Sequence, residues 1–422
     1  MAENQPANKN RVRRELSNFG ARLRHAILSE GRAPRGSDFK DPGRKGSWNS
    51  PLRDFEALAL ELFALQFEKN SAYRTICRAR DISPENIEHW SQIPAVPAAV
   101  FKELELTSIP PGERAVIFQS SGTTGQRPSR HFHHAESLAI YEASLSAWFF
   151  ENVLPELRIA NDDLRAHPTP MMFLTPSPAE APRSSLVYMF ETIRRRVGGS
   201  VEDSFFGRVA PNGTWTLDSE AVLTALSHRA SHPAPRALCL FGTAFSFVHL
   251  LDFLVEQNVS VHLPPGSCVM ETGGYKNQSR SMPKSELHAL ITHWLGVPPE
   301  NIICEYGMSE LSSQAYSLGA PASRRQGSAL LPEKDAGETL ALPGGAAHFS
   351  FPPWARVQIV SPENGCEVAE GGIGLIRVFD LANVFSVMAI QTEDLGIRRG
   401  DGFELIGRAK LAEPRGCSLM SA

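Results

Sequence analysis

The residues best suited to chemistry begin with a short polar loop. Residues 120–125 read SSGTTG, so hydroxyl side chains and two glycines fall within six positions. A tight turn of this composition can present several backbone N–H groups and hydroxyls to a single anion. The GxxxxGK[ST] and GxGxxG patterns are both absent, and composition alone leaves a phosphate cradle and an ordinary turn equally open.

Three later motifs supply carboxylates and a cation that would complete such a site. EYGMSE groups Tyr306, Ser309 and Glu310, where a carboxylate could hold Mg²⁺ and a hydroxyl could reach a phosphate. Asp394, in TEDLG, suits paired ribose hydroxyls, and Arg408, in GFELIGRAK, suits phosphate or a polarised carbonyl oxygen. Each motif alone could be a surface turn, so the prediction depends on their order along the chain.

The elements that must position these loops alternate in type. Strand-like apolar segments are MMFLTPSP, RALCLFGTAF, SCVMETGGYK and NIICEYGMSE, and the helical pattern recurs between them in SFVHLLDFLVEQ and MPKSELHALITHWLG. This alternation predicts an α/β fold with polar turns at the strand ends. Apolar periodicity also predicts a helix over residues 54–80 and another over about 135–151, and short β segments dominate after Phe351.

Composition excludes several classes of protein. The 422 residues carry a net charge of −4, with 42% hydrophobic and 21% charged residues, and this balance gives no general attraction to nucleic acid or anionic membranes. No apolar run reaches the ~18 to 20 residues of a membrane-spanning helix, so no membrane span is expected. Six cysteines without CxxC pairs or His-spaced clusters indicate free thiols in a reducing compartment, which predicts a cytoplasmic protein.

The first 46 residues are rich in arginine and end in a stretch of glycine, proline and serine. One interpretation is a basic arm that touches a partner. The pattern favours the other, a solvated helix followed by a mobile linker.

Taken in order, the motifs resemble the adenylate-forming superfamily of acyl-CoA synthetases, adenylation domains and luciferases. Within it the sequence is especially similar to the LuxE family of acyl-protein synthetases. It also resembles phenylacetate-CoA ligases more than it resembles the other synthetases. The resemblance covers roughly residues 70–420 and is carried by SSGTTGQRPSR, PRSSLVYMF, LFGTAFSFVHLLDFL, ETGGYKNQSRSMPK, EYGMSELSSQAY, TEDLG and GRAKLAEPRGCSL.

This resemblance implies an α/β fold in which a large adenylate-forming domain has several β-sheets and flanking helices, and the C-terminal lid domain is truncated to a short stub. The expected division is a basic arm and linker over residues 1–50, the adenylate-forming domain over 51–400 and the stub over 401–422. Only 14 residues follow Arg408, whereas larger members continue into a domain with a catalytic lysine. Lys276 or Lys410 could replace that lysine, or both could be solvated loop lysines.

The resemblance also implies roles for individual residues. The phosphates of ATP would lie against Ser120, Ser121, Gly122, Thr123, Thr124 and Gly125, and other nucleotide contacts would come from Gly273, Gly274, Tyr306, Gly307, Ser309, Asp394 and Arg408. Glu310 would hold Mg²⁺, and His134, Gly242 and Thr243 would line the acid pocket. The lysine of the family's TGxPKG loop is missing from TGQRPSR, which leaves its role to Arg127 or Arg130. Histidines 131, 133 and 134 could suggest zinc, but the absence of matching carboxylates favours hydrogen-bonded structure.

The implied function is that of an AMP-forming ligase, which activates a carboxylic acid, fatty or aromatic, as an acyl-adenylate and passes it to a thiol. Cys417, in EPRGCSL, would carry the acyl group, and Arg415 would favour its thiolate. Arg408 and Lys276 would assist catalysis, and a reductase or carrier protein would be the acceptor. A frayed terminus with an incidental cysteine is the alternative for Cys417. An acyl-CoA ligase using coenzyme A, or a non-catalytic nucleotide-binding module, is the alternative for the whole chain.

Overall fold

The computed structural model describes residues 5–30, 52, 54–120, 127–154, 170–232, 236–275, 279–317 and 347–409. Its helices are α1 (Gln5–Glu30), α2 (Phe55–Lys69), α3 (Ser71–Arg78), α4 (Val100–Glu103), α5 (Ala135–Asn152), α6 (Ser185–Val197), α7 (Ser219–Ala230), α8 (Ala244–Gln257) and α9 (Lys284–Leu295). Among the described residues, no helix combines the length and apolar character needed to cross a membrane.

A mixed sheet of 11 strands runs through the molecule. Its strands are β1 (Val96–Pro97), β4 (Met171–Phe173), β7 (Cys239–Thr243), β8 (Cys268–Thr272), β9 (Ile302–Tyr306), β10 (Ala315–Ser317), β11 (His348–Ser350), β12 (Ala355–Val360), β13 (Ile373–Asp380), β14 (Ala389–Arg399) and β15 (Gly402–Arg408). The order is β12–β13–β14–β15–β11–β10–β9–β8–β7–β4, with β1 beside β14. Two hairpins lie outside it, β2 (Val116–Gln119) with β3 (Arg130–His133), and β5 (Gly207–Val209) with β6 (Trp215–Leu217).

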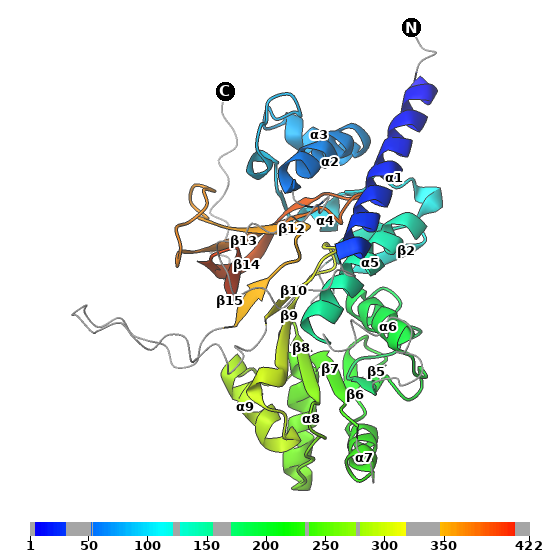
Figure 1. Ribbon diagram of the computed structural model, residues 1–422, viewed down its shortest axis with the longest axis vertical. Coiled ribbons are helices and arrows are strands. Elements are labelled where there is room, and N and C mark those ends of the chain that lie inside the picture. Colours follow the sequence, from blue (N-terminus) through cyan, green and yellow to red (C-terminus); the bar gives the residue numbers. More distant parts are fainter. Residues whose placement is uncertain are drawn as a thin grey trace, which may run out of the picture.

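Strands β4, β7, β8 and β9 form the parallel half of the sheet. Helix α8 connects β7 to β8, and α9 lies between β8 and β9 in the chain, so this half has the predicted α/β alternation. In Figure 1 these strands, drawn in green and yellow, lie beside α8 and α9 at one end of the molecule. The carboxyl ends of parallel strands share one edge of a sheet, so the polar turns after β7, β8 and β9 open on the same side.

The antiparallel half carries the C-terminal motifs. Strand β14 pairs with β13 on one side and β15 on the other, and Asp394 of β14 lies opposite Arg408 of β15. The described part of the expected stub therefore extends the main sheet through β15. Residues 410–422 lie outside the described residues.

Two expectations about helices are corrected. The helix predicted over residues 54–80 is two helices, because the side chain of Asn70 caps α3 by accepting a hydrogen bond from the Tyr73 amide at 3.1 Å. The basic N-terminal segment does form a helix, α1, but it is not solvated on every side. Phe19 is 1% exposed within the main core, and Gly20 lies where a Cβ atom would come within 2.8 Å of Ile140 Cδ1 on α5. The missing side chain allows α1 to lie close to α5.

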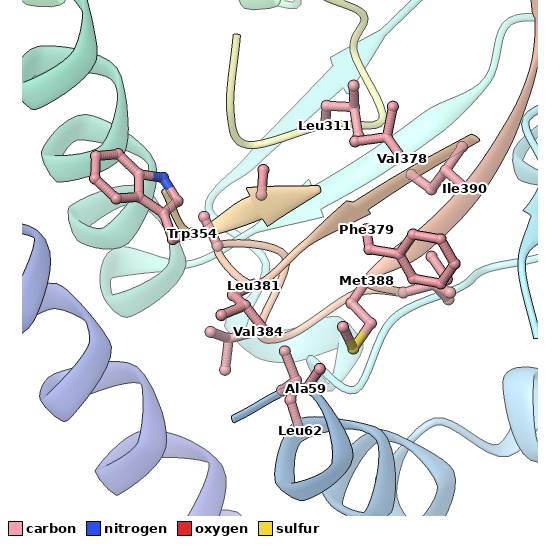
Figure 2. Close-up of a cluster of buried hydrophobic side chains, with 14 of the residues drawn as sticks. Ala59, Leu62, Leu311, Trp354, Val378, Phe379, Leu381, Val384, Met388 and Ile390 are labelled. Atoms are coloured by element: carbon pink, nitrogen blue, oxygen red, sulfur yellow. The ribbon is translucent and has the colours of Figure 1, made fainter. Parts of the chain in front are cut away.

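The largest core cluster joins the N-terminal helices to the antiparallel strands. Figure 2 shows Ala59 and Leu62 of α2 pointing toward Val384 and Met388, in the segment that links β13 to β14. All four side chains are at most 1% exposed. Burying an aliphatic side chain of this size contributes about 1.5–3 kcal/mol, so α2 and this segment stabilise each other.

Candidate functional site

The polar loop predicted to hold phosphates lies between the two strands of the β2–β3 hairpin. Ser120 follows β2, and its Oγ accepts a hydrogen bond of 3.0 Å from the backbone N–H of Ser129, just before β3. This contact ties the two ends of the loop together. Ser121, Gly122, Thr123, Thr124 and Gly125 lie outside the described residues, so their role stays a prediction.

The closed end of this hairpin meets the EYGMSE segment. Ser129 Oγ lies 3.4 Å from Ser309 Oγ, and Ser309 Oγ donates to Glu310 Oε2 at 3.1 Å. His131 Nδ1 donates to the backbone carbonyl of Ser309 at 2.9 Å. Residues separated by about 180 positions therefore form one polar cluster beside Glu310.

Glu310 has the environment of a cation ligand. Its side chain is buried, and burial raises the pKa of its carboxyl, although hydrogen bonds from Ser129 and Ser309 and the charge of Lys102 oppose the rise. A buried carboxylate among hydroxyl groups offers the hard oxygen ligands that Mg²⁺ prefers, and a cation would relieve the cost of its burial. The residues present therefore fit a magnesium ion.

His131 is held in place by a hydrogen bond to the backbone. Burial lowers its pKa to about 4, with the hydrogen bond to the Ser309 carbonyl acting in the opposite sense, so the ring is neutral near pH 7. The ring centroids of His131 and His133 are 4.3 Å apart, and burial also lowers the pKa of His133. The hydrogen-bonded structure predicted for the three histidines is present at His131 and His134, whereas both ring nitrogens of the buried His133 have no hydrogen-bond partner among the described residues.

A second cluster brings together the predicted ribose and hinge residues. Tyr306, at the end of β9, donates its hydroxyl hydrogen to Asp394 Oδ2 at 2.9 Å. Arg408 Nε lies 3.9 Å from Asp394 Oδ1, and the Arg408 side chain is 77% exposed. Burial raises the pKa of Asp394, while the Tyr306 hydrogen bond and the Arg408 charge lower it. The exposed guanidinium remains available to a ligand beside this carboxylate.

Two further glycines are required for different reasons, one by its backbone angle and one by lack of space. Gly273 has φ of 67° directly after β8, in the left-handed region that favours glycine. A Cβ atom on Gly307 would collide with Glu305 Oε1, so the turn after β9 passes directly over that carboxyl group. Gly274 has neither constraint, since its φ is not in the left-handed region and a Cβ atom added there would have open space around it. These turns leave backbone exposed at the shared edge of the sheet.

The residues predicted for the acid pocket have identifiable structural partners. Thr243 caps α8, accepting from the Ser246 N–H, and a Cβ on Gly242 would meet Leu174 Cβ at 3.0 Å. His134 caps α5, and its ring lies edge-on to Phe385 with centroids 4.5 Å apart. These contacts account for the residue types by packing and capping. Their role in binding an acid stays a prediction. The catalytic roles expected for Lys276, Lys410 and Cys417 also stay predictions, because these residues lie outside the described residues.

Sequence reasoning missed the residues that hold the EYGMSE turn in place. Asp380, at the end of β13, accepts hydrogen bonds from the backbone N–H groups of Ser312 and Ser313 at 2.9 and 2.8 Å. Asn383 Nδ2 donates to the Glu310 carbonyl at 2.9 Å. Burial raises the pKa of Asp380 to about 6, against these hydrogen bonds, so it is ionised at neutral pH. The partners lie about 70 positions apart, and no local motif signals the contact.

The fold is similar to that of adenylate-forming ligases. The chain is similar to 2-hydroxyisobutyryl-CoA ligase in its postadenylation state with 2-HIB-AMP, with a TM-score of 0.56 and 13% identity over 84% of this chain and 67% of that one. An open conformation of the same ligase, with 2-HIB-AMP and CoA, gives a TM-score of 0.54 and 14% identity over 83% and 74% of the two chains. The predicted fold class is confirmed.

Sequence comparison narrows the resemblance. The long-chain-fatty-acid–luciferin-component ligase of Aliivibrio fischeri is 22% identical over 379 residues, which is 87% of each chain. That of Vibrio harveyi is 21% identical over 366 residues, 85% of this chain and 84% of the relative. No family model matches the sequence. The similarity to LuxE ligases that the motifs indicated is confirmed.

Proposed function

We propose that this protein is an AMP-forming ligase of the acyl-protein synthetase kind. A carboxylate oxygen of the acid attacks the α-phosphorus of ATP, pyrophosphate leaves, and the resulting acyl-adenylate is attacked by a thiol, which forms a thioester and releases AMP. The observation that carries the proposal is the meeting of two clusters at the end of β9. Glu310 and Ser309 there contact the phosphate-loop hairpin, and Tyr306 contacts Asp394.

The residues divide the work of binding and charge neutralisation. Glu310 would hold Mg²⁺, which supplies charge stabilisation to the phosphates when bound. Ser309 would orient the α-phosphate, Asp394 would accept hydrogen bonds from the ribose hydroxyls, and Arg408 would approach the same nucleotide from its exposed position. None of these groups forms a covalent bond to the substrate, so their contribution is alignment and electrostatic stabilisation.

The first experiment is acid-dependent exchange of labelled pyrophosphate into ATP, measured over aromatic acids and fatty acids of increasing length. The relatives' names specify long-chain fatty acids for those proteins, and we infer a fatty or aromatic acid here. Glu310→Gln should lower exchange by orders of magnitude, whereas Glu300→Gln, at an exposed position, should not. Normal exchange in Glu310→Gln, with unchanged circular dichroism, would remove Glu310 from the mechanism.

Asp394 is tested by nucleotide affinity. Asp394→Ala should weaken ATP binding, because the ribose loses its acceptor and Tyr306 loses its partner. Asp401→Ala, on the exposed turn between β14 and β15, is the matched control. Equal ATP affinity in the Asp394 variant and the wild type would show that the ribose is held elsewhere.

The remaining step is transfer of the acyl group from the adenylate to an acceptor. We infer that Cys417 carries the acyl group before a protein partner receives it. This rests on the position of EPRGCSL after the hinge motif and on the similarity to LuxE ligases. Incubation with ATP, Mg²⁺ and the acid should add the acyl mass in a hydroxylamine-labile bond. Cys417→Ser should keep exchange and lose the adduct, and Cys366→Ser, at an exposed thiol, should keep both. Direct formation of acyl-CoA without an adduct would favour a CoA ligase.

The state of the cysteines bears on the compartment. The five cysteines among the described residues are all free thiols, four of them buried. Free thiols are typical of a reducing compartment, and we infer a cytoplasmic protein. Localisation of a tagged full-length chain by fractionation tests this.

A further inference from the structure

A carboxylate, an imidazole and a thiol lie close together near the turns that follow β8 and β9. These three side chains have no part in the proposed reaction. Glu271 is on β8, Cys304 is on the neighbouring strand β9, and His288 projects from α9. Glu271 is 0% exposed and Cys304 is 5% exposed. Among the described residues, these three form the group of His, Cys, Asp and Glu whose potential ligand atoms all lie within 4.8 Å of one another.

The three ligand atoms are spaced like the corners of a tetrahedral metal site. Cys304 Sγ lies 3.1 Å from Glu271 Oε1 and 3.7 Å from His288 Nε2, and the two latter atoms are 3.4 Å apart. A tetrahedral zinc ion with its usual bond lengths of ~2.3 Å to sulfur and ~2.0–2.1 Å to nitrogen or oxygen has ligand-to-ligand edges of about 3.3–3.6 Å. The observed triangle matches these edges to within a few tenths of an ångström.

Lys284 fixes the orientation of the Glu271 carboxylate. Lys284 donates to the other oxygen of Glu271, Oε2, and to the Gly273 carbonyl at 3.3 Å, which leaves Oε1 directed at Cys304 and His288. The outer oxygen of the Glu271 carboxylate is thus held by a second group, as in established metal sites.

We propose that Glu271, His288 and Cys304 bind one zinc ion, or a similar borderline divalent metal, separate from the magnesium of the nucleotide site. A thiolate and an imidazole suit zinc, whereas magnesium takes oxygen ligands. Binding replaces the Cys304 S–H bond with a metal–sulfur bond and releases one proton to solvent. The metal joins β8, β9 and α9 just below the turns that begin at Gly273 and Gly307.

The proposal is tested with the metal alone, so its outcome does not depend on catalysis. Full-length protein is stripped with a chelator, titrated with Co²⁺ and followed by absorption, because a tetrahedral cobalt–thiolate site gives intense visible bands and a sulfur-to-metal charge-transfer band. Zn²⁺ is then added as competitor, and metal content after desalting is measured by mass spectrometry. We expect one equivalent of metal per chain, displacement of Co²⁺ by Zn²⁺ and an increase in melting temperature with Zn²⁺.

Variants identify the ligands. Cys304→Ser should abolish the charge-transfer band, and His288→Asn, at a partly exposed helix position that disturbs the core least, should weaken Co²⁺ binding and remove the thermal shift. Cys268→Ser is the matched control, a buried cysteine on β8 outside the triangle, and should bind as the wild type does. Absence of stoichiometric binding by the wild type, or an unchanged charge-transfer band in Cys304→Ser, would overturn the proposal. Pyrophosphate exchange can succeed or fail independently of either result.

Discussion

Replacing Glu305 with glutamine should stabilise the protein at alkaline pH and leave its stability unchanged in acid. The Glu305 side chain lies on β9 beneath the turn at Gly307 and accepts a hydrogen bond from the Thr272 hydroxyl. Burial, with a smaller contribution from the neighbouring Glu271, raises its pKa from 4.5 to about 7, against that hydrogen bond. Glutamine keeps an oxygen for Thr272 and carries no charge, so the variant removes the titration with little change in shape.

The size of the effect follows from linkage. Between pH 4.5 and about 7 the folded protein holds a proton that the unfolded chain has released, so this group's contribution to stability falls as the pH rises. A shift of about 2.5 pKa units corresponds to about 3 kcal/mol at ~1.36 kcal/mol per unit. The free energy of unfolding of Glu305→Gln should therefore exceed that of the wild type by about 3 kcal/mol more at pH 8 than at pH 4.5.

Urea denaturation followed by circular dichroism at half-unit pH intervals measures this difference. Contributions from titrating groups that do not interact with Glu305 are shared by the two proteins and cancel. Glu300→Gln, an exposed substitution, should give a difference that stays near zero at every pH. A Glu305→Gln difference that does not grow between pH 4.5 and 8 would refute the assignment of a protonated Glu305 in the folded protein.

Three other substitutions test how the turns and the N-terminal helix are held. Gly307→Ala should cost about 1–3 kcal/mol of unfolding free energy and reduce pyrophosphate exchange, because the added Cβ would meet the Glu305 carboxyl, whereas Gly112→Ala, in open space, should do neither. Asp380→Asn replaces one acceptor oxygen by an NH₂ group that faces two backbone N–H donors. It should lower the free energy of unfolding, measured by denaturant titration, by about 3–6 kcal/mol. Phe19→Ala should lower the unfolding free energy by about 3–5 kcal/mol, and no loss would mean that α1 does not pack on the core in solution.

The sequence predicted elements better than their pairing. The four strands expected from apolar runs are present as β4, β7, β8 and β9, and β12 to β15 are the β segments expected after Phe351. Helix α5 begins and ends within a residue of its predicted bounds. The sequence did not predict the break between α2 and α3 at Asn70, because the apolar periodicity continues through this residue. Only the capping geometry of Asn70 interrupts the helix. The burial of α1 was readable in part, since Leu16, Phe19 and Leu23 recur at helical spacing among the arginines.

The candidate site shows the same division between local and long-range information. Motif order predicted that Glu310 and the SSGTTG loop would serve one ligand, and the contact between Ser129 and Ser309 places their segments together. Glu271, His288 and Cys304 gave no signal, because they are spaced 17 and 16 residues apart on three elements, and none belongs to a recognisable ligand motif. Such a group becomes visible only when β8 pairs with β9 and α9 packs beside them.

The way the EYGMSE turn is held explains how it can respond to a ligand. Its backbone is fixed from outside, since the Ser309 carbonyl accepts from His131, the Glu310 carbonyl accepts from Asn383, and the Ser312 N–H donates to Asp380. These contacts use no functional side chain of the turn itself. The Glu310 carboxylate accepts hydrogen bonds from the hydroxyl groups of Ser129 and Ser309 and from a backbone N–H, and the hydroxyl groups exchange readily with a cation or phosphate. A rigid backbone with exchangeable side-chain partners keeps the carboxylate in position while its own hydrogen bonds are replaced, which is what preorganised stabilisation of a phosphoryl group requires.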